Sequence, residues 1–297
     1  MKAAPFDYIR TESLAHALDL LGEYGPDAKL IAGGQSLVPM LAMRLARPTI
    51  LLDINRLPEI KGIADEGQHL VIGAATRQRD AEDASVVARR LQLMRLALRW
   101  VGHDQTRNRG TIGGSLVHAD PSAELPLTAV VMGVELELRS KAGGVRKIPA
   151  SEFFFGPMST AVREDECLTR MRWPTRERAG YGAAFEETAI RHGDFAMASA
   201  ACEVRLDANG VCSQASIGLG GVDGVPLAFP DLAAQVTGHK ITTSLAQELA
   251  HAAAVRAEPG SDVHASAGYR RHLARELLTR CLLKASVQAA GTMGEFQ

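Results

Sequence analysis

The stretch KLIAGGQSLVPMLAMRL, residues 29–45, passes from an apolar run through two adjacent glycines into residues with helical spacing. A strand that turns into a helix at Gly33 and Gly34 presents successive backbone N–H groups with no Cβ in front of them, at the positive end of the helix dipole. Such a corner suits a phosphate, and Gln35 and Ser36 add side-chain donors. Since a ligand-free tight turn is the commoner explanation of one Gly-Gly pair, this stretch alone predicts only a strand–turn–helix unit.

A second glycine pair strengthens the phosphate interpretation. Thr111, Ile112, Gly113, Gly114 and Ser115 repeat the same chemistry of small residues, two glycines and a hydroxyl. Two such loops could face each other across a pyrophosphate. Neither loop has the spacing of a G-x-G-x-x-G fingerprint or of a P-loop, so the usual dinucleotide and ATP signatures are absent.

The pattern around these loops predicts alternating strands and helices, followed by a hairpin and more helices. We expect a boundary near residues 175–180, and residues 102–124 are long for a connector, which is typical of a functional or disordered loop. Residues 291–297 look loose. From apolar periodicity, helices are expected over 13–25, 36–46, 84–101, 243–256 and 264–286, and strands over 29–32, 48–54, 69–76, 134–140, 167–174 and the two arms of a hairpin at 201–221. Ser13 is the expected N-cap of the first helix and Gly25 its stop.

Composition excludes several classes of function. The chain has 297 residues with 33 basic and 34 acidic side chains, a balance that does not suggest nucleic acid or an anionic membrane as a partner. It begins without the apolar core of a secretory signal and contains no run near the roughly 18 apolar residues of a membrane span, so we expect a cytoplasmic protein. Its four cysteines are far apart, which predicts buried free thiols rather than a disulfide framework or a metal cluster.

Polar residues flank the second glycine loop. Arg107 and Arg109 precede it, and His118 and Asp120 follow it. A His-x-Asp pair without a third ligand in spacing is a weak metal signal, and hydrogen bonding to loop backbone or to a cofactor's ribose is favoured instead. No nucleophile elbow, H-E-x-x-H or paired-carboxylate motif supports hydrolytic chemistry, and we predict no catalytic side chain and no metal ligand.

Longer stretches around both loops resemble a known family. The segments AGGQSLVPMLAMRLARPTILLDINRLPEIKGI and WVGHDQTRNRGTIGGSLVHADPSAELP resemble the FAD-binding medium subunit of molybdenum hydroxylases, the xanthine dehydrogenase and carbon monoxide dehydrogenase group. SEFFFGPMST, RHGDFA, IGLGGV and SDVHASAGYRRHLA add further matches. The resemblance covers nearly the whole chain, with both glycine loops in order.

This resemblance implies an α+β architecture: the vanillyl-alcohol-oxidase (PCMH)-type FAD-binding fold of two subdomains, with a C-terminal sheet-and-helix domain. On this basis residues 1–57 form the N-terminal FAD-binding subdomain and residues 58–177 the second. Residues 178–286 form the C-terminal flavoprotein domain, and residues 287–297 a flexible tail.

The resemblance also implies noncovalent FAD, its pyrophosphate pinched between the two glycine loops. Val101 is expected near the flavin, Leu168 at an apolar position by the flavin ring, and Glu124 in the place of an acidic FAD-contacting residue. The expected cofactor-binding residues are Lys29, Leu30, Ile31, Ala32, Gly33, Gly34, Gln35, Ser36, Val101, Thr111, Ile112, Gly113, Gly114, Ser115, Glu124 and Leu168.

The implied activity is electron transfer within an oxidoreductase complex. FAD would take electrons from 2Fe-2S clusters on a small subunit, and a molybdopterin cofactor on a large subunit would supply those clusters. The expected assembly is a dimer of heterotrimers without nucleic acid or a membrane span. The substrate could be an N-heterocycle, a purine, an aldehyde or carbon monoxide, and the external acceptor is open. Two alternatives remain, namely a self-sufficient flavin oxidase of the same fold and an FAD-bearing scaffold without redox exchange.

One position departs from the family pattern. Relatives often carry a lysine shortly after the phenylalanine that matches Phe185, and some use it to engage the cofactor, whereas this chain has Glu186 and Glu187. One interpretation is that an acidic pair there repels the phosphates of NAD; the simpler one is an exposed strand face.

Overall fold

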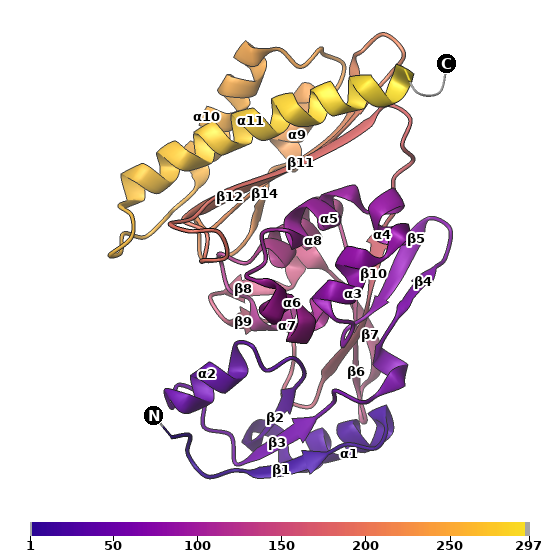
Figure 1. Ribbon diagram of the computed structural model, residues 1–297, viewed down its shortest axis with the longest axis vertical. Coiled ribbons are helices and arrows are strands. Elements are labelled where there is room, and N and C mark those ends of the chain that lie inside the picture. Colours follow the sequence, from indigo (N-terminus) through magenta and orange to yellow (C-terminus); the bar gives the residue numbers. More distant parts are fainter. Residues whose placement is uncertain (1, 295–297) are drawn as a thin grey trace.

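The computed structural model describes residues 2–294 and contains three main sheets stacked along the long axis (Figure 1). The N-terminal sheet has three parallel strands in the order β1-β3-β2: β1 (Asp7–Arg10), β2 (Ala28–Ile31) and β3 (Ile50–Asp53). The connections are α1 (Leu14–Tyr24) and α2 (Leu37–Ala42). Ser13 caps α1 by accepting a hydrogen bond from the His16 N–H (3.1 Å), and Gly25 ends it at φ +51°, as the sequence predicts.

The second sheet is antiparallel and lies in the middle of the molecule, in the order β4-β5-β10-β6-β7. Its central strand, β10, comes last in the sequence. A two-stranded ribbon and a group of short helices belong to this region. The strands are β4 (Ile63–Asp65), β5 (His69–Gly73), β6 (Glu135–Ser140), β7 (Gly144–Pro149), β8 (Phe154–Gly156), β9 (Ser159–Thr160) and β10 (Cys167–Pro174); the helices are α3 (Gln78–Asp83), α4 (Ser85–Arg90), α5 (Gln92–Leu98), α6 (Asp104–Arg109), α7 (Ile112–His118) and α8 (Glu124–Met132).

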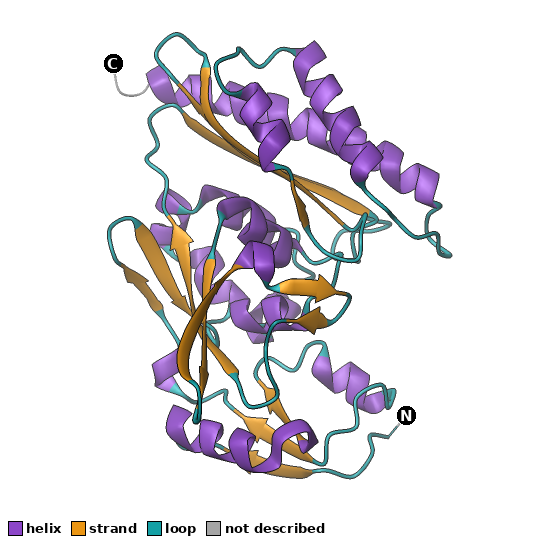
Figure 2. Cartoon of the chain, turned by 180° about the vertical axis from the view of Figure 1, so that it is seen from behind, coloured by secondary structure: helices purple, strands orange, loops and turns teal. Residues whose placement is uncertain are grey.

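The C-terminal sheet has its outer face covered by α11, as Figure 2 shows from behind. Its inner face packs on α8 and α5, so the alternate residues of β11 serve two cores. Gly182 allows the close approach of α11, since a Cβ there would lie 2.0 Å from the Ala285 carbonyl oxygen. The elements are β11 (Tyr181–Thr188), β12 (Ala198–Leu206), β13 (Cys212–Gly220), β14 (Leu227–Ala228), α9 (Pro230–Val236), α10 (Thr243–Arg256) and α11 (Ala267–Gly294).

The structure confirms the α+β class, the hairpin of β12 and β13, and the four buried free cysteines. The helix expected over residues 84–101 is two helices, α4 and α5, because Leu91 leaves the helical region at φ −128°, ψ 59°. Residues 102–124, expected to be a long loop, contain α6 and α7. Among the described residues, no helix is long and apolar enough to cross a bilayer.

The C-terminal end also differs from the expectation. The last helix runs through to Gly294, so the tail proposed from residue 287 is helical up to that point, and residues 295–297 lie outside the described part of the chain. Ala285 and Ala289 pack into the core beneath α11, which extends the buried face of the helix past the predicted end.

Candidate functional site

A cavity of about 1070 Å³ opens where the three parts of the molecule meet. This volume lies at the upper end of the range for small-molecule sites, which suits a ligand the size of a dinucleotide. Of the expected cofactor-binding residues, Ile31 and Ile112 are not in the wall, because Ile31 belongs to β2 beneath the turn and Ile112 is fully buried in the core. The others all line the cavity: Lys29, Leu30, Ala32, Gly33, Gly34, Gln35, Ser36, Val101, Thr111, Gly113, Gly114, Ser115, Glu124 and Leu168.

The first glycine loop, residues 29–36, presents unused backbone donors to the cavity. Within residues 2–294, the N–H groups of Gly34, Gln35 and Ser36 have no protein acceptor. Gly34 has φ +72°, a conformation that glycine adopts without strain. Ser36 precedes α2 but makes no capping hydrogen bond, so its hydroxyl is also unused. This loop therefore has the donor chemistry of an anion site.

The second glycine loop, residues 111–115, uses its N–H groups differently from the expectation. Gly113 N–H donates to the Ala74 carbonyl (2.9 Å), and Gly114 N–H donates to the Thr111 hydroxyl (3.1 Å), which caps α7. The N–H groups of Ile112 and Ser115 are bonded too, to Thr76 and Thr111 carbonyls. The prediction that this loop offers free successive N–H groups is therefore wrong. Two of these groups bond to Ala74 and Thr76, just after β5, and the other two bond to Thr111 within the loop.

Its glycines are required for close packing instead. A Cβ on Gly113 would lie 2.5 Å from the Ala74 Cβ and 2.8 Å from the Ala74 carbonyl oxygen. A Cβ on Gly114 would lie 2.6 Å from the Thr111 Oγ1. The second loop brings the backbone of α7 against the end of β5 and leaves the Ser115 side chain at the cavity wall.

A chain of hydrogen bonds fixes the two loops to each other. Asn55, just after β3, donates from Nδ2 to the Ala32 carbonyl, and Arg77 donates from Nη2 to Asn55 Oδ1 (2.7 Å). Arg77 also donates to the Arg109 carbonyl at the end of α6. That same carbonyl oxygen would lie 2.4 Å from a Cβ on Gly33, so the loops meet with no room for a side chain there.

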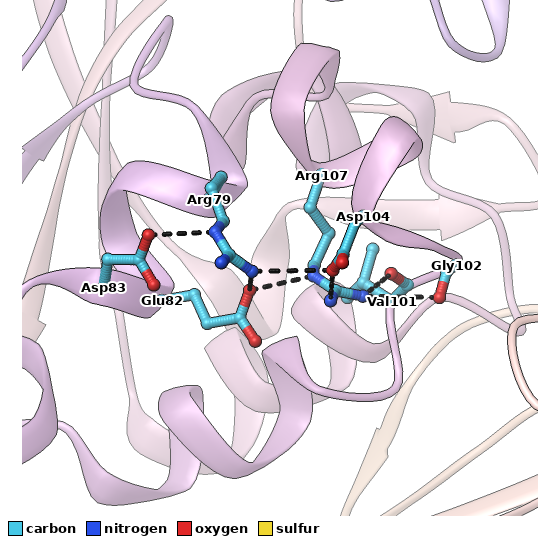
Figure 3. Close-up of polar contacts among 7 residues, drawn as sticks. All are labelled: Arg79, Glu82, Asp83, Val101, Gly102, Asp104 and Arg107. Carbon is cyan, nitrogen blue, oxygen red and sulfur yellow. Dashed lines mark hydrogen bonds and ion pairs between the residues drawn. The ribbon is translucent and has the colours of Figure 1, made fainter.

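A network of ion pairs and hydrogen bonds surrounds the buried Arg107 next to Val101 (Figure 3). Arg107 on α6 donates to the Val101 and Gly102 carbonyls (3.0 and 3.3 Å) and pairs with Glu82 on α3 (2.9 Å). Its side chain is 9% exposed. Asp104 bridges the network from the start of α6 to Arg107 and Arg79. The pairs within α3 and within α6 are local i,i+3 and i,i+4 pairs, whereas the pairs that join the two helices, Arg107 with Glu82 and Arg79 with Asp104, have no local signal in the sequence.

The C-terminal domain forms a wall that sequence reasoning did not assign to the site. Arg270 on α11 donates to the Met197 carbonyl (2.7 Å) and the Gly221 carbonyl (3.2 Å), and it pairs with Asp262 (2.7 Å). All but Gly221 line the cavity. The stretches RHGDFA and SDVHASAGYRRHLA, which contain or adjoin these residues, resemble the family, but the resemblance gave them no role in the site.

Two acids near the cavity have altered pKa values. Burial raises the pKa of Glu124 to about 7. A backbone hydrogen bond and the charge of Arg107 lower this pKa but only partly offset the effect of burial. Burial, together with the charge of Glu124, raises the pKa of Glu187 to about 9. Glu186 points to the opposite side of β11 and pairs with Lys284 on α11. The adjacent glutamates are therefore not one exposed acidic face.

The chain matches known families along most of its length. Residues 4–176 match the FAD binding domain in molybdopterin dehydrogenase, and residues 183–285 match the CO dehydrogenase flavoprotein C-terminal domain. The 6-hydroxypseudooxynicotine dehydrogenase complex subunit alpha of Paenarthrobacter nicotinovorans is 38% identical over 98% of each chain.

Solved structures agree with these matches. A chain of carbon monoxide dehydrogenase from Hydrogenophaga pseudoflava superposes with a TM-score of 0.93 at 36% identity, covering 97% of this chain and 99% of that one. A chain of quinoline 2-oxidoreductase from Pseudomonas putida 86 gives 0.92 at 35% identity, with 99% and 100% covered.

Proposed function

Because the chain belongs to the family of FAD-binding medium subunits of molybdenum hydroxylases, we propose that it binds FAD noncovalently across the two glycine loops. In this role it passes electrons from iron–sulfur clusters on a partner subunit to an external acceptor. The observation that carries the proposal is the set of unused N–H groups at Gly34, Gln35 and Ser36, which face a cavity of dinucleotide size.

The residues present fit FAD. Three amides and the Ser36 hydroxyl supply donors for a diphosphate, in a turn that Gly34 forms at φ +72°. Ser115 adds a hydroxyl from the second loop. Gln78 has a buried Oε1 without a protein partner in the described part of the chain, and it lies in the same wall.

The contribution of this chain is to bind and orient the FAD. When bound, FAD supplies redox chemistry that exchanges electrons singly or in pairs. The Asn55–Arg77 hydrogen bonds hold the first loop against the second, and Arg107 fixes Val101 under the cavity. Leu168 on β10 gives the wall an apolar surface. No side chain of this chain has to transfer a proton to a substrate.

The complex around this chain is part of the proposal. A large subunit would hold the molybdopterin cofactor and a small subunit the 2Fe-2S clusters, in a dimer of heterotrimers located in the cytoplasm. The substrate binds on the large subunit and is an N-heterocycle, a purine, an aldehyde or carbon monoxide.

Two experiments test the electron-transfer function. The purified chain should bind one FAD per polypeptide and release all of it on denaturation. Flavin that stays with acid-precipitated protein would contradict noncovalent binding. Under anaerobic conditions, N-heterocycles should leave the flavin of the isolated chain oxidised, whereas adding the large and small subunits should allow substrate to bleach it. Bleaching without partners would instead support the self-sufficient oxidase, which the comparisons do not favour.

A further inference from the structure

Gln78, the first residue of α3, is a buried amide in the cavity wall that sequence reasoning did not select. The residue is only 5% exposed. Neither end of its side-chain amide makes a hydrogen bond within residues 2–294, and Oε1 is fully buried. An amide that loses its hydrogen bonds to water on folding costs free energy unless another partner replaces them. The described residues do not supply that partner, so the cavity is where it enters.

The backbone holds Gln78 at the place where the two glycine loops meet. Its N–H donates to the carbonyl of Gly110 (3.0 Å), the residue directly before the second loop. Gly110 also touches the first loop, because a Cβ on Gly33 would lie 2.8 Å from the Gly110 Cα. Gly110 therefore contacts both Gln78 and the first loop, which places the amide next to the site proposed for the diphosphate.

The glycine at position 110 leaves space for this amide. Its backbone has φ −59° and ψ 148°, angles that any residue can adopt, so the conformation itself does not require glycine. A Cβ on Gly110 would instead lie 2.5 Å from Gln78 Oε1 and 3.0 Å from Gln78 Cδ. The absence of a side chain at Gly110 is therefore what allows the Gln78 amide to lie against it in the cavity wall.

The unpartnered atom indicates the chemistry of its ligand. Oε1 is a carbonyl oxygen, so its partner is a hydrogen-bond donor. The phosphate oxygens of FAD are acceptors, and the first loop already offers them free N–H groups. The donors of FAD nearest to its diphosphate are hydroxyls, which belong to the ribityl chain on one side and to the adenosine ribose on the other. The terminal torsion of glutamine is broad, so rotation of the amide can turn Oε1 toward such a hydroxyl.

We propose that Gln78 is a cofactor-binding residue whose Oε1 accepts a hydrogen bond from a sugar hydroxyl beside the FAD diphosphate. The inference rests on the proposed function, because it requires FAD in this cavity. In this arrangement the first glycine loop binds the phosphates and Gln78 orients the adjoining sugar. The amide is unbonded in the protein alone because its partner belongs to the cofactor.

The Gln78→Met variant tests this role with two measurements. Methionine has a similar length but no carbonyl, so the dissociation constant for FAD should rise on the order of five- to tenfold, equivalent to about 1 to 1.4 kcal/mol. The melting temperature of the apoprotein should stay the same or rise, since the amide makes no hydrogen bond within the protein. An unchanged dissociation constant, or an apoprotein that melts at a lower temperature than the unchanged one, would overturn the proposal.

Gln92→Met is the matched control. Gln92 is likewise the first residue of a short helix, α5, and it is partly buried but outside the cavity wall. Its dissociation constant should stay within twofold of the unchanged value, and an equal rise in both variants would overturn the proposal. If Gln78→Met does not fold, Gln78→Asn takes its place, because it keeps the amide but withdraws the carbonyl by one methylene. It should weaken FAD binding by a similar factor, and unchanged affinity would overturn the proposal.

Smaller ligands identify which hydroxyl is bound. FMN carries the ribityl chain without the ribose, and ADP carries the ribose and the diphosphate without the ribityl chain; competition with FAD gives both affinities. A ribityl contact predicts that Gln78→Met weakens FMN and leaves ADP unchanged, and a ribose contact predicts the reverse. Loss of affinity for neither ligand would overturn the proposal.

The same titrations separate this inference from the proposed function. If the unchanged protein binds no FAD, the proposed function fails. If the unchanged protein binds FAD and Gln78→Met binds it equally well, the proposed function stands and only the role of Gln78 is overturned.

Discussion

The two glycine loops have the same chemistry in the sequence, and their N–H groups have different roles in the structure. The first loop leaves the N–H groups of Gly34, Gln35 and Ser36 unused at the cavity. The second loop bonds its N–H groups to Ala74, Thr76 and Thr111 and uses its glycines for close packing. A glycine pair before a serine is therefore compatible either with binding an anion or with bringing two backbones together.

The difference follows from the helix that each loop precedes and from what that helix packs on. The first loop precedes α2, a six-residue helix at one end of the molecule, and its turn is exposed to the cavity. The second loop begins a helix that packs directly on the residues after β5. Substitutions should separate the two roles, since changes in the second loop should affect mainly folding and changes in the first mainly FAD.

The largest expected effect is that of Gly113→Ala on stability. The new Cβ would lie 2.5 to 2.8 Å from three atoms of Ala74, two of which are backbone atoms that cannot rotate away. We expect a loss of about 3 kcal/mol in the free energy of unfolding, typical of an overpacked site. Urea unfolding of the apoprotein measures it, with Gly22→Ala in α1, where no atom lies within 4 Å, as the control. A loss equal to that of the control would show that the second loop tolerates a side chain.

The next effect is that of Gly34→Ala on FAD binding. Alanine at φ +72° costs about 1 to 2 kcal/mol, and adjustment of the turn would move the unused N–H groups. We expect FAD affinity to fall at least tenfold, with a smaller change in apoprotein stability than for Gly113→Ala. Fluorescence titration of the apoprotein gives the affinity. Unchanged affinity would remove the first loop from the FAD site.

A smaller effect is expected for the N-cap of α7, which Thr111 of the second loop provides. Thr111→Val keeps the shape of the side chain but removes the oxygen that accepts the Gly114 N–H. We expect a loss of about 1 kcal/mol in stability, as for other lost helix caps. Thermal unfolding measures it, and the result would contradict the structure if Thr111→Ser were as destabilising as Thr111→Val.

The smallest effect concerns the hydroxyl of the first loop. Ser36→Ala removes no hydrogen bond within the protein, so apoprotein stability should change by less than about 0.5 kcal/mol. FAD binding should weaken by about 1 kcal/mol, the typical contribution of one neutral hydrogen bond. The free energy of unfolding and the FAD affinity are both measured on the same preparation of the variant. A stability loss without a change in FAD affinity would reverse the roles assigned to the two loops.

Much of the fold could be predicted because its signals are local. The Ser13 cap, the Gly25 stop and the alternating residues of β12 and β13 act within a few positions of one another. Both glycine loops and most of their cavity contacts were also predicted, although only with the help of the family resemblance. Whether FAD contacts these residues remains a prediction.

The rest depended on contacts between distant residues. Helices α6 and α7 have six and seven residues, too few for a clear apolar period, and the buried Arg107 of α6 pairs with Glu82 of α3, 25 residues earlier in the chain. Likewise, the N–H groups of the second loop looked free in the sequence, because their acceptors, Ala74 and Thr76, lie far away along the chain.

The position of β10 in the middle of its sheet has a consequence for biosynthesis. Its neighbours β5 and β6 are synthesised before β10, so they can take their places in the sheet only after β10 has been made. Ala74, whose carbonyl anchors Gly113, is itself bonded through its N–H to the Thr169 carbonyl on β10 (2.9 Å). The nascent chain can therefore complete the second loop only after β10 has been translated. We accordingly expect the flavin to be loaded late in maturation.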